Sequence, residues 1–450
     1  MALNQDQTLD RVSPNQGIGI FGQLLIISLF IPLKFSLGSL LLTPYRLVIL
    51  VAIAPVMMNW LSGAAGKKTK PDYFMLIYVT WSVIATMYNH GFVLIEKMAI
   101  YFIEIGGTYF IARTQIRSVK AAVDAFKLLW LGVLFLLPFA LYESFTNRSL
   151  FQTFLGSFSS PRVMADTRLG LFRAQAAFDH PILLGMFAGS IIAPSYYVLA
   201  HGKSFIQKIM KTLIPLACAF SSLSSGAFAG VAIQIGLIGW DTVVKAKNRW
   251  KILSLLAVAA YVAVDLLSTR SPYAVLISYL SFSSGSAYNR ILIWRFAQDD
   301  LFRNPIFGIG FNEWDRPAWM HSASTDNFWL VIALNYGIVG FMFFFLAFIF
   351  AIRYLIMQNF TDPLAIAYRR GYIIMLVGLG TAIFTVHMWG AAIIVFVFYI
   401  GMHAITAEEG NAATQSSPQA KPEKRRLPTT RRRQPAAGRL HRGGRKQGAS

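Results

Sequence analysis

The chain has 450 residues, of which 55% are hydrophobic and only 14% are charged, and it contains a single cysteine. Repeated apolar runs of about 20 residues in such a composition predict an all-α membrane protein with many transmembrane helices, not a set of soluble domains. One cysteine excludes an intramolecular disulfide. The sequence has no Walker motif, zinc-ligand spacing or glycine-rich dinucleotide loop, so an ATP-driven enzyme and a zinc protease have no support.

The apolar runs predict about twelve transmembrane helices, which with their loops form one domain over residues 18–406. The expected spans are residues 18–35, 40–60, 72–89, 93–112, 122–143, 176–200, 207–222, 225–241, 251–268, 327–351, 371–387 and 389–406. Residues 1–17 form a short N-terminal segment, and residues 407–450 form a C-terminal tail.

Basic residues in alternate loops predict the orientation of the chain. Cytoplasmic loops of membrane proteins carry an excess of lysine and arginine. The clusters are Lys67, Lys68 and Lys70; Arg113, Arg117 and Lys120; Lys203, Lys208 and Lys211; Lys245, Lys247, Arg249 and Lys251; and Arg353, Arg369 and Arg370. Placing both termini in the cytoplasm puts all of these clusters inside, so we expect that orientation.

Part of the net charge of +21 lies in the tail, where residues 407–450 carry eleven Lys and Arg against three Glu. The tail is rich in proline and glycine and cannot bury a core, so we expect it to be disordered. Nucleic-acid binding is an alternative for such a segment, but attraction to the anionic lipids of the bilayer is favoured. We therefore expect no nucleic-acid partner.

Two long segments then fall on the outer face, at residues 144–175 and 269–326. They are the outer loops with room for a site, and all of their basic residues are arginines: Arg148, Arg162, Arg168, Arg173, Arg270, Arg290, Arg295, Arg303 and Arg316. The planar guanidinium binds phosphate through two parallel hydrogen bonds, whereas lysine acts as a point charge. The choice favours a phosphorylated ligand at the outer surface, with ordinary surface arginines as the alternative.

The stretch SAYNRILIWRFAQDD predicts a helix in the second outer segment. At 100° per residue, Arg290 lies in the middle of a face that also carries four apolar residues: Ile293, Trp294, Ala297 and Leu301. An unpartnered guanidinium there costs several kcal/mol, so Arg290 predicts an anionic partner, either a carboxylate, a lipid head group or a substrate phosphate. Arg295 and Asp299 are expected to pair on the polar face.

The stretch RAQAAFDHPILLG places polar residues at the outer mouth of a span. Pro181 fits the first turn of a helix, so Asp179 and His180 lie just before it. His180 is a candidate proton carrier or hydrogen-bond donor to a sugar. The alternative is structural, with Asp179 as a helix cap and His180 as a packed side chain.

The stretch WMHSASTDNFWL precedes another span. Asp326 or Thr325 is the expected N-cap of the helix. His321 or Asp326 is a candidate to accept the proton of a hydroxyl nucleophile. Phe328 and Trp329 suit stacking on sugar faces, and an interfacial aromatic belt explains them equally well.

These segments, with NRILIWRFAQDDLFRNPIFGIGFNEW and DNFWLVIALNYGIVGF, resemble signature segments of the O-antigen ligase and polymerase family, which includes exopolysaccharide polymerases. The resemblance extends from the early spans to about residue 350 and is strongest over residues 286–340. It implies a metal-independent glycosyltransferase of the bacterial inner membrane with its active site on the periplasmic side. The implied donor is a glycan on undecaprenyl diphosphate.

For individual residues, the resemblance implies that Arg173 and Arg290 hold the diphosphate and that His321 or Asp326 lies in the region of the base. The sequence departs from the family in having Asp326 where His often precedes Asn327.

A second departure is Ser224-Ser225 in place of a usual Ser-Arg pair, which makes Arg168 a candidate replacement. The expected substrate-binding residues are Arg168, His180, Trp294, Asn327 and Arg295.

We therefore expect a polymerase that joins undecaprenyl-diphosphate-linked repeat units in cell-surface or exopolysaccharide synthesis. One alternative is an O-antigen ligase that transfers the glycan to a lipid core or other acceptor. Another is a transporter or flippase of lipid-linked sugars, which charges such as Glu96, Lys97, Glu104 and Asp265 would suit. The expected partners are the lipid-linked glycan, an acceptor glycan or glycolipid, the bilayer and other polysaccharide-assembly proteins. No metal or other cofactor is expected.

Overall fold

The computed structural model describes residues 16–162, 167–280, 284–320 and 322–415, and most of them are helical. Two antiparallel hairpins accompany the helices, β1 (Phe35–Leu37) with β2 (Leu40–Leu42) and β3 (Thr167–Arg168) with β4 (Leu171–Phe172). The helices are α1 (Ile20–Ser28), α2 (Pro44–Leu61), α3 (Lys70–His90), η1 (Gly91–Leu94), α4 (Ile95–Gln115), α5 (Val119–Thr146), α6 (Leu150–Leu155), η2 (Gly156–Phe158), α7 (Pro181–Ser190), α8 (Ile192–Pro194), η3 (Ser195–Leu199), α9 (Phe205–Ser221), α10 (Ser225–Val243), α11 (Arg249–Leu267), α12 (Pro272–Leu280), α13 (Ser284–Arg303), α14 (Phe328–Ile356), α15 (Pro363–Ala382), α16 (Ala391–Gly401) and α17 (Ala407–Gln415).

Within the described residues, six helical segments are long and apolar enough to cross a membrane. They are α2, α5, the continuous segment Pro181–Leu199, α10, α11 and α14. Each expected span contains a helix, but α1 has nine residues and α16 has eleven. At about 1.5 Å per residue, each of these two helices is long enough to cross roughly half of a hydrocarbon core of about 30 Å. The fold is therefore that of an all-α multi-pass membrane protein, and spans beyond these six stay a prediction.

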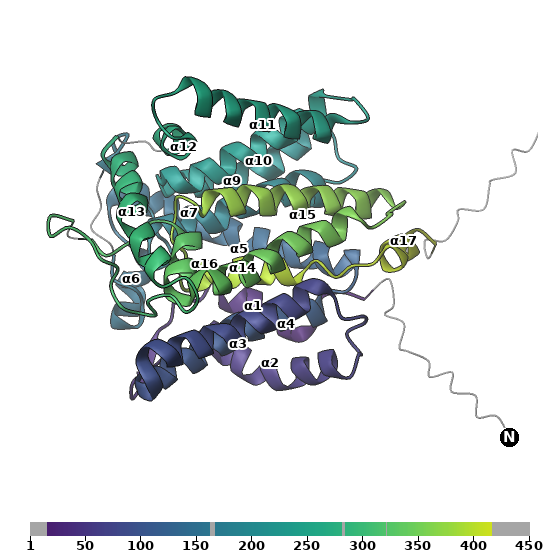
Figure 1. Cartoon of the computed structure of the whole chain (residues 1–450). Helices are drawn as coiled ribbons and strands as arrows, with labels where there is room; N and C mark the ends of the chain where they lie inside the picture. Colours follow the sequence, from purple (N-terminus) through teal and green to yellow (C-terminus); the bar gives the residue numbers. More distant parts are fainter. Residues whose placement is uncertain (1–15, 163–166, 281–283, 321, 416–450) are drawn as a thin grey trace, which may run out of the picture.

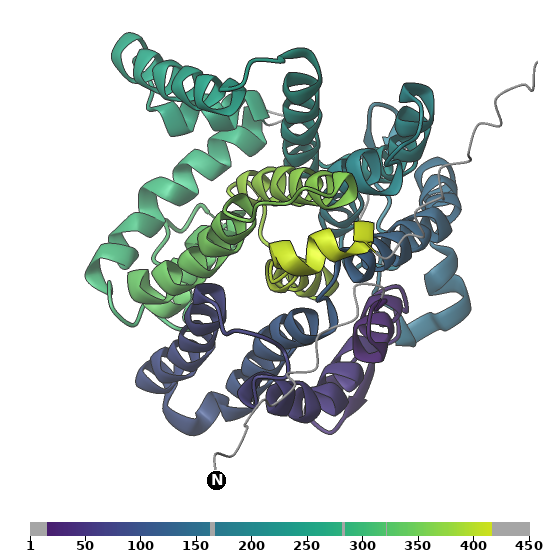
Figure 2. The same ribbon diagram turned by 90° about the vertical axis from the view of Figure 1, so that its right-hand side faces the viewer.

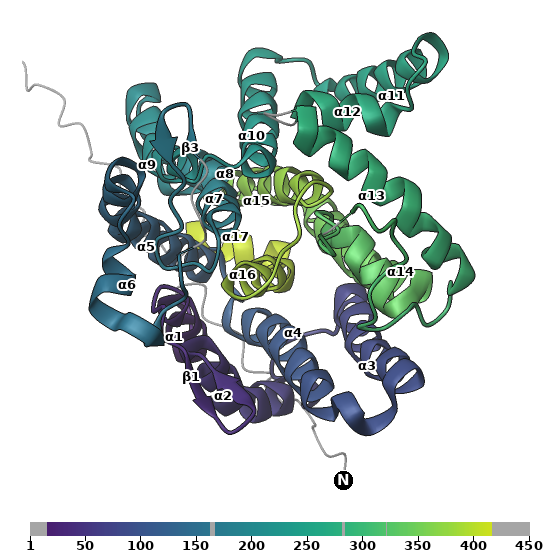
Figure 3. The ribbon, with the colours of Figure 1, turned by 90° about the vertical axis from the view of Figure 1, so that its left-hand side faces the viewer.

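Helix α16 lies at the centre of the bundle, surrounded by other helices that include α4, α7 and α14 (Figures 2 and 3). Its residues from Ala392 to Gly401 are all buried, which explains why the helix is apolar on every side. Helix α11 has the opposite surroundings, since it projects from the bundle beside α12 and buries none of its residues (Figure 3). Its apolar side chains are therefore available to lipid.

Several loops that carry the basic clusters lie at one end of the bundle, together with α17 (Figure 1). Arg117 pairs with Glu409 of α17 at 3.4 Å, and Arg370 of α15 pairs with Asp241 of α10 at 3.6 Å. These contacts join basic residues of the loops and of α15 to carboxylates that are far away in the sequence. The outer segments with α6 and α13 lie at the opposite end (Figure 1).

Residues 407–415, which begin the tail that was expected to be disordered, form helix α17. The Glu409 carboxylate accepts a hydrogen bond of 2.9 Å from Thr406 N, besides its pair with Arg117. Asn411 Oδ1 accepts one of 2.7 Å from Thr361 N. These side-chain contacts give the start of the tail a structural partner, whereas residues 416–450 lie outside the described residues.

A buried ion pair joins helices α3 and α4 at the basic end of the bundle. Arg113 Nε lies 3.0 Å from Asp72 Oδ1, and the two side chains are 2% and 0% exposed. Asp72 also accepts hydrogen bonds from Tyr109 Oη, Trp60 Nε1 and Thr69 N, at 2.7, 3.2 and 2.8 Å. Every partner is provided by the protein, as a charge without water requires.

The segment that follows α13 packs its backbone directly against α14, and glycines make this contact possible. Gly337 interrupts α14 with a φ of 74°, and the freed carbonyls of Leu334 and Asn335 accept hydrogen bonds from Ile309 N and Gly310 N at 2.7 and 3.2 Å. Gly308 has a φ of 67°, and a Cβ there would lie 2.2 Å from Leu334 O. The PIFGIG motif thus needs glycine because two backbones touch.

We predict that Arg113→Met destabilises the protein by about 3–5 kcal/mol, because it leaves the Asp72 carboxylate buried without its cation. The measurement is unfolding of the purified protein in detergent. Lys120→Met is the control, since the Lys120–Asp124 pair is exposed and should contribute about 0–1 kcal/mol. An equal loss in the two variants would contradict the prediction.

We also predict that Gly308→Ala lowers the thermal stability more than Gly156→Ala does. Both glycines have a positive φ, which strains an alanine at either position. A Cβ at Gly156 meets no atom within 4 Å, whereas one at Gly308 overlaps α14. Equal melting temperatures for the two variants would show that the backbone contact is not constraining.

Candidate active site

Segments that are far apart in the sequence meet at the outer end of the bundle around the start of α14 (Figure 3). The N-cap of α14 is Asn327, whose Oδ1 accepts a hydrogen bond of 3.1 Å from Leu330 N, so the expectation of Asp326 or Thr325 as the cap is wrong. Asp326 instead has a left-handed φ of 44°. Its carboxylate accepts a hydrogen bond of 2.8 Å from Ser324 Oγ.

Arg290 lies on the buried face of α13, only 6% exposed, together with Ile293, Ala297 and Leu301. The helical periodicity therefore described this face well, except that Trp294 is 39% exposed at its edge. Burial lowers the pKa of Arg290 below its ordinary value, and the Asp326 carboxylate opposes this shift. A protein carboxylate is thus one anionic partner that Arg290 has.

Arg168 brings a second positive charge to Arg290. It lies on the β3–β4 hairpin, and its Nη1 donates a hydrogen bond of 3.0 Å to Leu223 O in the turn between α9 and α10. Its charge is one of the causes that lower the pKa of Arg290. Two like charges close together in a partly buried site favour an anion nearby.

Arg173 follows the same hairpin and approaches the same turn. Its Nε donates a hydrogen bond of 3.4 Å to Ser222 O, one residue from the partner of Arg168. The preceding outer loop is held by Glu143, which pairs with Arg162 at 3.1 Å and accepts a hydrogen bond from Ala176 N. The structure therefore brings Arg168 and Arg173 to one turn, while Arg162 has a carboxylate of its own.

His180 is the N-cap of α7, and this role fixes its tautomer. Its Nδ1 accepts a hydrogen bond of 3.1 Å from Ile182 N, so the proton of the neutral ring resides on Nε2. Burial, followed by the charge of Arg173, lowers the pKa of His180 to about 4, against an opposing effect of Asp326. At neutral pH His180 is therefore uncharged and can donate a hydrogen bond from Nε2, and its expected role as a proton carrier stays a prediction.

Three residues at the site were not identified from the sequence. Burial lowers the pKa of His387 to about 4, and Asp326 opposes the shift. Trp389 stacks on His387 with ring centroids 5.4 Å apart and contacts His180 at 5.7 Å. His387 and Trp389 lie between α15 and α16, where the sequence analysis expected almost continuous spans, so their loop position was hidden by the apolar residues around them.

Tyr273 of α12 is the third of these residues. Burial raises the pKa of Tyr273, and a hydrogen bond with Asn327 and the charge of Arg290 oppose this. Its ring centroid lies 5.7 Å from that of Trp294. Asn327 and Trp294, both expected to bind substrate, thus border the cluster, which we define as Arg168, Arg173, His180, Tyr273, Arg290, Asp326 and His387.

Other expected site residues lie elsewhere. Arg295 is exposed on α13, and its expected pair with Asp299 is absent from the ion pairs of the described residues. His321 lies outside the described residues. Phe328 and Trp329 are 2% and 3% exposed, so packing in the core, and not stacking on sugar, explains these two aromatic side chains.

Residues 212–345 match the family model described as O-antigen ligase. The match covers Arg290 and Asp326, together with the turn between α9 and α10 that accepts hydrogen bonds from Arg168 and Arg173. No curated protein matches the chain.

We predict that the protein loses stability as the pH falls from about 6.5 to 4, in part through His387. In this window an unfolded histidine binds a proton that folded His387, with its pKa of about 4, does not bind. The free energy of unfolding therefore decreases as the pH falls. His387→Gln should therefore lose less melting temperature between pH 7.5 and 5.0 than the wild type. His201→Gln, at an exposed turn, is the control, and equal losses in all three proteins would refute the prediction.

Proposed function

We propose that this protein joins lipid-linked oligosaccharides at the periplasmic face in cell-surface biosynthesis, because residues 212–345 match the family model described as O-antigen ligase. The single observation that carries the proposal is the convergence of Arg168, Arg173 and Arg290 beside the Asp326 carboxylate. Three guanidinium groups and one carboxylate leave an excess of positive charge at the site. A diphosphate is the substrate group that fits this excess.

In this mechanism the arginines hold the diphosphate of an undecaprenyl-linked donor. Negative charge grows on the diphosphate as the bond between the sugar C1 and the phosphate oxygen breaks. Preorganised donors in such a site stabilise developing charge by about 2.7–4 kcal/mol each. No metal is required for this, because the fixed guanidinium groups neutralise the leaving group; full activity in a chelator is the expected result.

The acceptor supplies a hydroxyl that attacks C1 from the face opposite the diphosphate. A bond forms between this oxygen and C1, and the hydroxyl proton passes to Asp326, the described carboxylate that faces the arginines. His180 donates a hydrogen bond from Nε2 to an oxygen of the glycan donor, and the imidazole stays neutral. Since diphosphate is already a good leaving group, positioning and electrostatics contribute most.

Between the two acceptor types we propose a polymerase, in which the acceptor is another lipid-linked repeat unit, with a ligase as the alternative. A transporter has less support from the structure, because charges that would suit one have partners. Of the four charges named for it, Glu104 pairs with Arg46 at 2.6 Å and Lys97 lies over the ring of Phe311.

We predict that a strain lacking the gene accumulates single repeat units where polymer should be, and that Arg290→Ala fails to restore the polymer. The measurement is gel and mass analysis of lipid-linked and surface glycans. Long polymer that remains on the undecaprenyl carrier would instead identify a ligase. Unchanged glycans in the strain would refute glycan transfer by this protein.

Two further variants make this test specific. Arg290→Lys keeps the charge but loses the planar fork, so we expect at least a tenfold loss of transfer activity. Arg148→Ala removes an exposed arginine from the other outer segment and should behave as the wild type. Full activity of Arg290→Lys would show that paired hydrogen bonds to phosphate are not used.

A further inference from the structure

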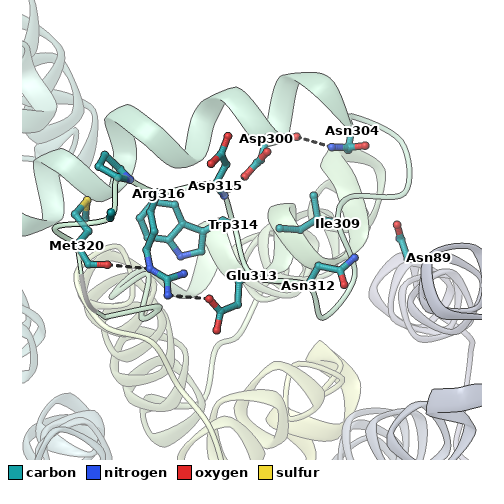
Figure 4. Close-up of a pocket in the computed structure, with 12 residues that line it drawn as sticks. Asn89, Asp300, Asn304, Ile309, Asn312, Glu313, Trp314, Asp315, Arg316 and Met320 are labelled. Atoms are coloured by element: carbon teal, nitrogen blue, oxygen red, sulfur yellow. Dashed lines mark hydrogen bonds and ion pairs between the residues drawn. The ribbon is translucent and has the colours of Figure 1, made fainter.

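A hollow lies beside the C-terminal end of α13 (Figure 4), whereas Arg290 lies in the N-terminal half of this helix. It has a volume of about 780 Å³, which is ample for a small oligosaccharide. Its lining includes Asn304 at the end of α13, Asn312 in the following segment and Asn89 at the end of α3. None of the arginines of the active-site cluster lines it.

The lining offers uncharged and acidic groups in place of the arginine excess of the cluster. Asp300, Glu313 and Asp315 contribute three carboxylates, and Arg316 is the arginine among the lining residues. Arg303, outside the lining, pairs with Asp300 at 3.7 Å and with Asp315 at 3.6 Å, so three carboxylates face two guanidinium groups. Figure 4 shows Arg316 held between Glu313, at 2.7 Å, and the carbonyl of Met320, at 2.9 Å. This balance of charge disfavours a phosphate and admits a neutral or cationic ligand.

Amides and carboxylates together suit the hydroxyl groups of sugars. A side-chain amide both donates and accepts hydrogen bonds, and an ionised carboxylate accepts them, while each sugar hydroxyl does both. Asn89 Nδ2 donates hydrogen bonds to Ala85 O and Phe307 O, and Asn304 Nδ2 donates one to Asp300 O, so these two amides face a ligand mainly as acceptors. The Asp315 and Glu313 side chains are each 71% exposed at the rim. Polar groups therefore approach the hollow from several sides, as binding of a polyhydroxylated ligand requires.

The wall of the hollow is held firmly. The backbone contact between Gly308 and α14 lies at the base of the segment that carries Asn312, and Trp314 is 4% exposed with its Nε1 bonded to Ala323 O at 2.9 Å. Asp315 N donates a hydrogen bond to Asp300, which ties the segment back to α13. Preorganised walls lower the cost of ordering a ligand.

Asp300 follows Arg290 by ten residues on one helix, which corresponds to about 15 Å along the axis. We infer that the hollow binds uncharged or amino sugars of the glycan chain, several sugar units from the reacting diphosphate end. The inference rests on the proposed function. It assigns the arginine cluster to the diphosphate and the hollow to the glycan, so that α13 orients the chain between them.

The test uses the full-length protein in lipid nanodiscs and an oligosaccharide of two repeat units, released from the host's surface glycan and free of the carrier. Binding is followed by saturation-transfer NMR. We expect binding by the wild type and equal binding by Arg290→Ala, because the probe has no diphosphate. The double variant Asn312→Ala, Asp315→Asn should bind at least tenfold more weakly.

Asp299→Asn is the matched control, since Asp299 is an exposed carboxylate on α13 outside the lining. If the double variant unfolds, Glu313→Gln at the exposed rim is the second variant, and it should also bind the oligosaccharide more weakly. No binding by the wild type, or wild-type affinity in all lining variants, would overturn the inference. The wild type could also bind the oligosaccharide through the lining residues and yet transfer no glycan. That result would leave the inference intact and refute the proposed function.

Discussion

Loss of water around charged side chains is the constraint that governs both ends of this bundle. A chain with 55% hydrophobic residues has few places where a charge remains hydrated, so each buried charge needs a partner. At the basic end, Asp72 and Arg113 satisfy each other within the protein. At the outer end, buried Arg290 lies near the charges of Asp326 and Arg168, and Arg168 and Arg173 donate hydrogen bonds to one turn. The same physical rule thus produces a structural site at one end and a candidate active site at the other.

The sequence revealed those parts of the site that depend on local periodicity. Arg290 was found because 100° steps placed it among apolar residues, and the burial of Ile293 and Ala297 follows the same pattern. His180 was found because Pro181 marks the first turn of a helix. In each case the information lies within a few residues of the side chain concerned.

Features that depend on contacts between distant segments were not predictable in this way. His387 and Tyr273 reach Asp326 only because the loop between α15 and α16 and helix α12 pack beside the start of α14. The cap at Asn327 was assigned one or two residues too early, since a left-handed Asp326 has no signature in the sequence. The number of spans was also difficult to predict, because a central helix such as α16 is as apolar as a helix in lipid.

The role of His180 as a helix cap has a consequence for small molecules that would compete at this site. Rotation of the ring to present Nδ1 would break the hydrogen bond from Ile182 N and leave the start of α7 without its cap. A competing compound therefore always meets a donor at His180 and positive charge at Arg173. Under the proposed function, an inhibitor at this position would accept a hydrogen bond from Nε2 between the opposite charges of Arg173 and Asp326.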